Sequence, residues 1–132
     1  MSWNPLAETF KTNSAINGVP CFDQIIIMDA AGNMWGASSG FTNLPDAERK
    51  AIPNLFKNPD SARAGGITIN GKKYFVLQAD ENMIMGKKGG DGCVAMKTKG
   101  AIVVTTHVPP IQTPELVNKT EPVVQYLKEQ GH

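Results

Sequence analysis

The sequence is short of the residues on which several kinds of functional site depend. It has two cysteines and two histidines among 132 residues. Neither Cys21 nor Cys93 belongs to a Cys-x-x-Cys pair or has a histidine at ligand spacing, which argues against a disulfide framework and a zinc site. Two buried thiols are the simplest interpretation. We therefore expect no metal and no other cofactor.

Net charge and long apolar runs are scarce as well. Thirteen Lys and Arg residues balance twelve Asp and Glu residues, which leaves a net charge of +1, so general attraction to nucleic acid is not expected. Apolar runs such as 25–28 and 101–104 fall far below the roughly 20 residues of a membrane-spanning helix. The first residues lack the basic and apolar regions of a secretion signal. We expect one cytoplasmic domain over residues 1–132.

Apolar and β-branched segments in the middle of the chain predict antiparallel strands. Residues 21–29 and 34–38 flank a short turn and predict a hairpin. Asn70-Gly71 separates two strand-like runs within 66–77, and this dipeptide favours a tight type I′ turn. The remaining predicted strands lie at 82–87, 93–98 and 101–108. These segments form an antiparallel meander, which needs helices to cover its apolar face.

Two helices are predicted before the long run of strands. Ser2 can cap a helix over about residues 3–11. The segment 43–48, which begins with Asn43, is typical of a second helix start, and Pro53 should end or kink that helix after about two turns.

A third helix is predicted at the C-terminus. It should open at Thr113 as the cap, with Pro114 in the first helical position. Pro122 should then interrupt it, and Thr120 and Glu121 could serve as the restart. The overall class is therefore α+β.

The motifs that suggest catalysis are weak. Cys93, His107 and Asp29 contain the groups of a nucleophilic triad, but their spacing gives it no support. The glycine- and lysine-rich run 85–92 lacks the spacing of a phosphate-binding loop and lies between strands. We expect a binding protein and not an enzyme, and a small cysteine hydrolase is the alternative.

Positive charge is concentrated in the middle of the chain. Residues 61–100 contain seven basic and three acidic residues, a net charge of +4, whereas the rest of the chain has a net charge of −3. Because strands of a meander lie side by side, these lysines could form one basic surface facing an acidic partner. Lysines that only solvate and protect strand edges are the alternative.

Six short motifs occur in one order along the whole chain and together resemble the profilin family, particularly the profilins of protists and plants. They are Ser2-Trp3, Trp35, Gly71-Lys72-Lys73-Tyr74, Gly86-Lys87-Lys88-Gly89, Lys97-Thr98 and the ending Tyr126-Leu127-Lys128-Glu129-Gln130-Gly131. The resemblance implies an antiparallel sheet of six to seven strands, with the N- and C-terminal helices on one face and short helices on the other.

The resemblance also implies a function at the cytoskeleton. A profilin-like monomer would bind monomeric actin and regulate its polymerisation and nucleotide exchange. It would dock proline-rich proteins, such as formin-type assembly factors, and contact phosphoinositides. An alternative is a module of the same fold that binds actin or another protein and has lost polyproline binding.

Candidate residues follow from the resemblance, position by position. Leu6 and His132 depart from the aromatic residues usual in the family, so we expect weakened polyproline binding. The polyproline candidates are Trp3, Leu6, Trp35, Tyr126, Leu127 and His132. The actin candidates are Lys73, Phe75, Lys88, Asn118, Lys119 and Glu121. The phosphoinositide candidates are Lys72, Lys87, Lys88 and Lys97.

Overall fold

The computed structural model describes residues 3–38, 41 and 44–132. In chain order its elements are α1 (Asn4–Asn13), β1 (Gln24–Asp29), β2 (Met34–Ala37), α2 (Asp46–Lys57), α3 (Pro59–Gly65), β3 (Ile67–Ile69), β4 (Lys72–Ala79), β5 (Met83–Lys88), β6 (Asp91–Lys97), β7 (Ala101–His107) and α4 (Thr113–Glu129). The predicted α+β class is confirmed.

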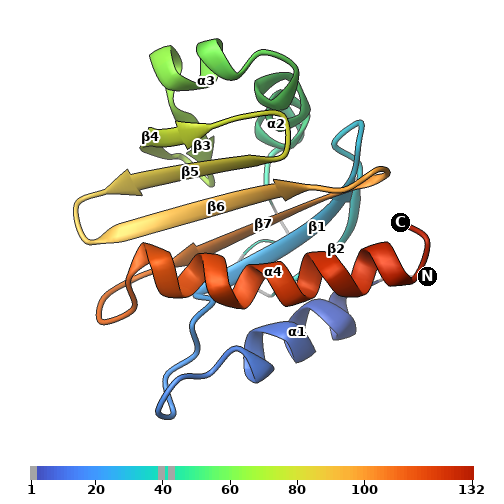
Figure 1. Ribbon diagram of the computed structural model, residues 1–132, viewed down its shortest axis with the longest axis vertical. Helices are drawn as coiled ribbons and strands as arrows, with labels where there is room; N and C mark the ends of the chain where they lie inside the picture. The colour runs from blue at the N-terminus through green and yellow to red at the C-terminus, as the bar shows by residue number, and fades with distance from the viewer. Residues whose placement is uncertain (1–2, 39–40, 42–43) are drawn as a thin grey trace.

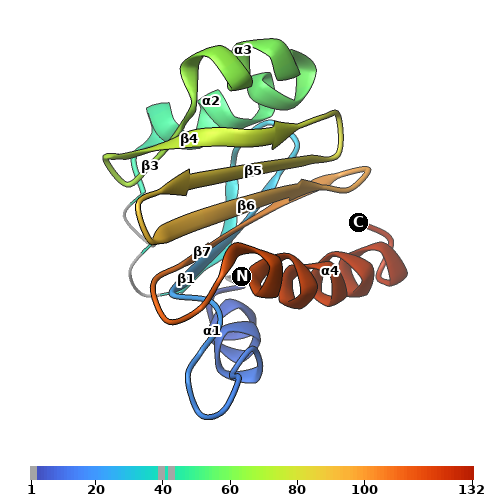
Figure 2. The same cartoon turned by 60° about the vertical axis from the view of Figure 1, so that its left-hand side comes forward.

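The seven strands form one antiparallel sheet in the order β2-β1-β7-β6-β5-β4-β3. The predicted hairpin turn is present, because Asn70 and Gly71 both have the positive φ of a type I′ turn, 52° and 79°. Figures 1 and 2 show α1 and α4 side by side on one face of the sheet, with α2 and α3 beside β3 and β4. Buried residues of α2 and α3 pack against the opposite face from α1 and α4, so the predicted layers are correct.

Side-chain alternation along the strands builds two cores, one on each face of the sheet. Ile26 and Met28 of β1 pack with α2 and α3, where Ile52 and Phe56 are buried. Ile25 of β1 joins α1 and α4 in the second core. The central strands, apolar on both faces, hold the sheet between the two helical layers.

Proline does not end α2 where expected. The helix starts at Asp46 and continues through Pro53 to Lys57. Asn43, at the start of the predicted segment, lies outside the described residues. The break comes at Asn58, whose side chain accepts a hydrogen bond from the Ser61 N–H at 3.3 Å and caps the short α3. Pro53 is buried, and burial of its ring offsets the loss of its N–H.

Helix α4 also differs from the prediction at two points. Its N-cap is Gln112 and not Thr113, because the Glu115 carboxylate accepts a hydrogen bond from the Gln112 N–H at 2.9 Å. The helix runs unbroken through Pro122. Pro122 and Asn118, whose carbonyl loses its helical donor, are both exposed, so water can hydrogen-bond that carbonyl.

A buried ridge fixes α4 on the sheet. Leu116, Thr120 and Leu127 are fully buried, and the Thr120 hydroxyl lies 2.8 Å from the hydroxyl of Thr105 on β7. Among the described residues, no helix combines the length and hydropathy that a membrane crossing requires.

Candidate binding surfaces

The start of α1 crosses directly over β2. The Trp3 N–H donates to the Trp35 carbonyl at 2.9 Å, and the Ala37 N–H donates to the Asn4 side-chain oxygen at 2.8 Å. A Cβ at Gly36 would lie 2.5 Å from the Trp3 Cβ and 2.6 Å from its carbonyl oxygen. Glycine at position 36 is therefore what allows the Trp3 backbone to lie on β2. The predicted cap, Ser2, lies outside the described residues; Trp3 is the N-cap residue, without a side-chain cap bond.

The C-terminal residue is held in place by its own main chain. Gly131 turns the chain away from α4 with a φ of 86°, and the His132 N–H donates to the Leu127 carbonyl at 2.9 Å. The main-chain oxygen of His132 accepts from the Thr98 hydroxyl at 2.8 Å and from the Gly100 N–H at 3.0 Å. These bonds place the imidazole beside α1 and β2.

Trp3, Trp35 and His132 form one aromatic group, which we call the Trp cluster. The ring centroids of Trp3 and Trp35 are 4.9 Å apart, and the imidazole lies 5.1 Å from Trp3 and 5.2 Å from Trp35. With Met34 these rings line a hollow of about 180 Å³. The structure thus brings together three of the six polyproline candidates.

The other three candidates have different environments. Leu6 lies half-buried on α1, Tyr126 is 41% exposed and Leu127 is fully buried. Leu127 therefore lies beneath the surface and does not line it.

The sequence motifs did not indicate Phe10, whose ring packs edge-on against that of Tyr126, with centroids 5.7 Å apart. Its spacing of seven residues from Trp3 and four from Leu6, which places it on the same face of a helix, could have indicated it.

Strand β4 presents an exposed apolar row beside a lysine. Lys73, Phe75 and Leu77 alternate onto one face, with Phe75 71% and Leu77 61% exposed. Lys87 of β5 is the cross-strand partner of Phe75, so it shares that face. We call Lys73, Phe75, Leu77 and Lys87 the β4–β5 face. Exposed apolar side chains flanked by cations fit a protein interface.

The sheet register separates Lys88 from this face. Lys88 is opposite Asp91, and strand alternation places it on the side of the buried Tyr74. Lys72 is on that same side, where its ammonium lies 2.5 Å from the Asp91 carboxylate and 5.7 Å from the Tyr74 ring centroid.

The lysines proposed for phosphoinositides do not form one group. Because β5 and β6 are antiparallel, Lys97 lies near Met83, at the opposite end of the strands from Lys87 and Lys88. Six residues along a strand correspond to about 20 Å. One headgroup cannot contact both ends.

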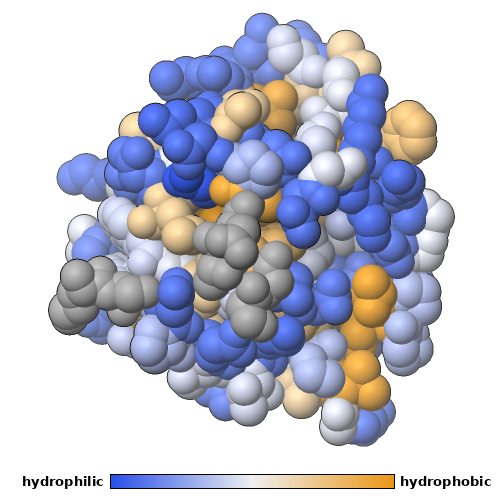
Figure 3. All heavy atoms as spheres, turned by 180° about the vertical axis from the view of Figure 1, so that it is seen from behind, coloured by the Kyte–Doolittle hydropathy of each residue, from blue (hydrophilic) through white to orange (hydrophobic). Residues whose placement is uncertain are grey.

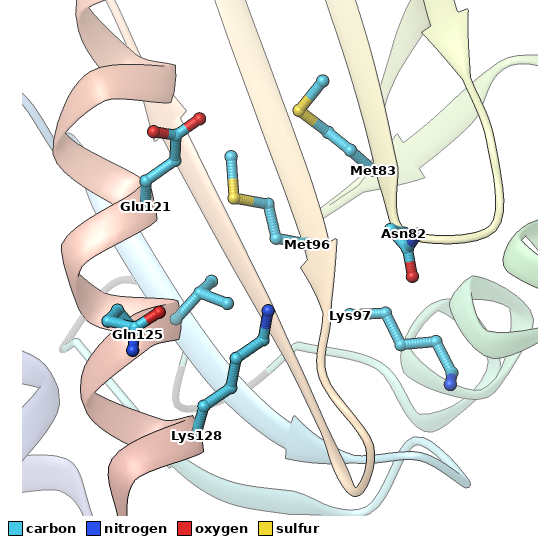
Figure 4. A pocket seen from close by; sticks show the side chains of 8 residues that line it. Asn82, Met83, Met96, Lys97, Glu121, Gln125 and Lys128 are labelled. Carbon is cyan, nitrogen blue, oxygen red and sulfur yellow. The ribbon is translucent and has the colours of Figure 1, made fainter.

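The actin candidates on α4 divide between two sides of the helix. Lys119 lines a hollow toward α1, whereas Glu121 lines a hollow of about 350 Å³ between α4 and the β5–β6 strands. Figure 4 shows Met83 and Met96 at this second hollow, with Glu121 and Lys128 on its helix side. Asn118 is exposed near the start of the helix. Residues 119 and 121 differ by about 200° around the helix axis.

The groups of the imagined triad do not assemble. Cys93 is fully buried in the first core, and burial raises the pKa of its thiol to about 12, which disfavours the reactive thiolate. His107 is 1% exposed, and its Nε2 lies 2.9 Å from the Thr113 hydroxyl. Asp29 pairs with Ala101, at the other end of β7 from His107.

The side of the molecule away from α4 has two hollows, one of about 260 Å³ between α2 and β3 and one of about 220 Å³ beside β1, β4 and β7, but none of the candidate residues from the sequence except Lys72 lines them. Seen from behind, it carries mainly hydrophilic residues, and its hydrophobic residues form small groups (Figure 3). The candidate residues from the sequence gather at two surfaces, the Trp cluster with its neighbours and the β4–β5 face.

Comparisons with known proteins agree with this geometry. The family model Profilin matches residues 1–132. Profilin-1B of Acanthamoeba castellanii is 35% identical over 131 residues, with 99% of each chain covered, and Profilin-3 of Dictyostelium discoideum is 39% identical over 99% of each chain.

Solved structures give the same result. That of Acanthamoeba castellanii profilin IB has a TM-score of 0.88 and 33% identity, and covers 99% of this chain and 100% of its own. A mouse profilin IIa in complex with a double repeat from the FH1 domain of mDia1 has a TM-score of 0.73 at 19% identity, with both chains fully covered, and is similar in fold alone.

Proposed function

Since this chain belongs to the profilin family of actin regulators, we propose that it binds monomeric actin through the β4–β5 face. Phe75, at 71% exposure, is the observation that carries this proposal. Burial of Phe75 and Leu77 would supply the apolar centre of the interface. Lys73 and Lys87 would steer an acidic partner and form pairs at the rim.

The exposed part of α4 extends this surface. Asn118 near its start and Glu121 on its sheet side add polar contacts beside the apolar row. Lys119 faces α1, so we assign it no contact with actin. Binding at this surface would cover one end of the actin monomer and block assembly there. It would favour the actin state that exchanges nucleotide faster, which requires higher affinity for that state. The proposed role is binding and not catalysis. The proposed location is the cytoplasm.

Actin assembly followed by pyrene fluorescence tests the surface with a matched pair of variants. Lys87→Glu and Lys88→Glu make the same charge change at adjacent positions on opposite faces of β5. Excess wild-type protein should slow spontaneous assembly. Lys87→Glu should weaken this effect more than Lys88→Glu. Equal effects of the two variants, or wild-type protein without effect, would contradict the assigned face.

We also propose that the Trp cluster binds proline-rich segments. A polyproline II helix offers flat rings and unpaired carbonyls, which aromatic faces and indole N–H groups complement. The tight packing of Trp3, Trp35 and His132 favours this function over the alternative of a module that has lost it. The profilin bound to an FH1 repeat makes formin-type segments the partner to test first.

Binding should be weaker than with a full aromatic surface, because Leu6 and His132 provide less stacking area. Each aromatic contact contributes about 0.5–1.5 kcal/mol, so two reduced contacts correspond to roughly tenfold in affinity. Titrating a proline-rich peptide into the protein, with tryptophan fluorescence as the readout, measures this affinity. Trp3→Ala should abolish the response. No change in wild-type fluorescence at millimolar peptide would refute the proposal.

Contact with phosphoinositides is a third proposal, limited to one end of the sheet. Lys87 and Lys88 are exposed there, and each could contribute about 1 kcal/mol near an anionic surface. Lys72 is already paired with Asp91, and Lys97 is too distant to join them. Co-sedimentation with phosphoinositide-containing vesicles should exceed that with neutral vesicles, and Lys87→Glu should reduce the difference. Equal co-sedimentation would contradict the proposal.

A further inference from the structure

The chain contains two Asn-Gly dipeptides, Asn17-Gly18 and Asn70-Gly71, and they form turns of the same type. Asn17 and Gly18 have φ values of 51° and 82°, close to the 52° and 79° of Asn70 and Gly71, as a type I′ turn requires. All four residues are exposed, and a Cβ at either glycine would meet no atom within 4 Å. The two turns are therefore alike in sequence, backbone conformation and access to water.

An asparagine followed by glycine can lose its side-chain amide without an enzyme. The main-chain nitrogen of the glycine attacks Cγ of the asparagine, the Cγ–Nδ2 bond breaks, and ammonia leaves with the proton of the glycine N–H. Water then opens the cyclic imide at one of its two carbonyls, which gives aspartate or isoaspartate, and no oxidant or reductant takes part. Glycine favours the attack because it has no Cβ to hinder ring closure. Each deamidation adds one negative charge to the chain.

The type I′ turn itself opposes this attack. In such a turn ψ of the asparagine is about +30°, which places the glycine nitrogen nearly opposite Cβ across the Cα–C bond. Ring closure needs that nitrogen on the same side as Cβ, so the turn must open first. How easily each turn opens therefore decides how fast its asparagine reacts.

A carboxylate of α2 holds the Asn70-Gly71 turn closed. One oxygen of the half-buried Glu48 accepts a hydrogen bond from the Asn70 N–H, and the other accepts from the Gly71 N–H at 2.9 Å. Hydrogen bonds to a charged acceptor are roughly twice as strong as neutral ones. The nitrogen that would attack is thus bound through its own proton. The turn also closes the β3–β4 pairing, in which Ile69 is opposite Lys72.

The Asn17-Gly18 turn lacks this support. The flanking Ile16 and Val19 form an isolated bridge with two main-chain hydrogen bonds of 2.8 and 3.0 Å. Among the described residues, none accepts a hydrogen bond from the Gly18 N–H. Opening this turn breaks the isolated bridge alone, whereas opening the other breaks sheet pairing and both bonds to Glu48.

We propose that Asn17 is the site at which this protein deamidates spontaneously, and that Glu48 protects Asn70 from the same reaction. The protected position is the one where the product would disturb more of the fold. Isoaspartate at position 70 would lengthen the main chain of the turn by one carbon and shift the pairing of β3 with β4. A new carboxylate on residue 70 would also repel Glu48. Position 17 lies outside the sheet, and the inference depends on neither proposed binding surface.

The test follows both asparagines in one molecule. The full chain is incubated in mildly alkaline buffer, and peptide mapping by mass spectrometry measures the replacement of NH₂ by OH at each site. In wild type, Asn17 should deamidate at least about tenfold faster than Asn70. Glu48→Ala should speed the reaction of Asn70 by about ten- to hundredfold, as expected for the loss of bonds to a charged acceptor. The Asn17 rate should not change.

Two further variants complete the test. Glu48→Gln keeps one carbonyl acceptor without the charge, so it should speed the reaction of Asn70 less than Glu48→Ala does. Glu81→Ala removes an exposed carboxylate just after β4, at the other end of that strand from the Asn70-Gly71 turn. It is the matched control, and both asparagines should react in it as in wild type.

Each other result contradicts a particular step. Equal rates at Asn17 and Asn70 in wild type, or no reaction at Asn17, would overturn the assignment of the site. An unchanged Asn70 rate in Glu48→Ala would show that Glu48 does not protect it. A rise at both asparagines in Glu48→Ala would mean that this variant unfolds. Glu48→Gln then decides, and protection by Glu48 is wrong unless the Asn70 rate alone rises.

Discussion

Gly36→Ala is expected to displace Trp3 and so weaken both α1 docking and ligand binding. The new methyl carbon would lie 2.5 Å from the Trp3 Cβ, whereas carbon atoms in contact are normally about 3.5–4.0 Å apart. The Trp3 main chain must therefore move by about 1 Å or more. Such a movement breaks the 2.9 Å hydrogen bond to the Trp35 carbonyl and opens the 4.9 Å ring contact.

The size of the effect follows from the interactions that this displacement disrupts. Overpacking of this kind costs about 1–3 kcal/mol of unfolding free energy. The ligand loses the aligned rings of Trp3 and Trp35, which at about 0.5–1.5 kcal/mol each corresponds to roughly tenfold or more in affinity. The β4–β5 face is formed by other strands, so the effect on actin assembly should not change.

Three measurements on one variant check this reasoning: urea unfolding, titration with a ten-proline peptide and pyrene-actin assembly. Gly65→Ala is the control, because a Cβ at Gly65 meets no atom within 4 Å and removes only backbone freedom. The control should bind as wild type does. If Gly36→Ala has the same stability and the same peptide affinity as wild type, the close crossing of Trp3 over β2 is wrong.

Two further predictions concern α4 and the end of β7. Pro122→Ala should raise the melting temperature by several degrees, because it restores the N–H donor to the exposed Asn118 carbonyl; an unchanged or lower value in calorimetry would contradict this. Burial lowers the pKa of His107 in the folded protein, so as the pH falls the His107 side chain is protonated in the unfolded chain before it is protonated in the folded one. The unfolding free energy should therefore fall as pH drops below about 6.5, and His107→Gln should lessen this fall in urea titrations.

The strands could be predicted because local patterns determine them. The β-branched run of β1 and the Asn70-Gly71 turn depend on neighbouring residues only, and both are present. Whether a helix continues through a proline was less predictable, because the free-energy cost of the missing N–H depends on how that part of the helix packs. Pro53 is buried and Pro122 is exposed, so each helix continues for a different reason. Neither environment can be inferred from the sequence near the proline.

The grouping of site residues depends on register and helix phase, which the sequence motifs do not contain. Lys87 and Lys88 are adjacent in one motif but lie on opposite faces of β5. Lys119 and Glu121 are two residues apart but line different hollows. The Trp cluster was predictable only through the resemblance, since Trp3, Trp35 and His132 are distant in sequence. Phe10 could have been predicted from its helical spacing relative to Trp3 and Leu6.

Helix α4 lies between the two proposed surfaces, and its packing determines how they can be used. Tyr126 faces α1, and Glu121 faces the β5–β6 strands. The buried Leu116, Thr120 and Leu127 hold the helix on the sheet between these sides. Because neither ligand needs to displace this ridge, binding at one surface gives no energetic reason for a change at the other. On the two proposals, we therefore expect that an actin monomer and a proline-rich segment bind the protein together, and that an actin-binding titration gives the same affinity with and without saturating proline-rich peptide; a changed affinity would contradict this independence.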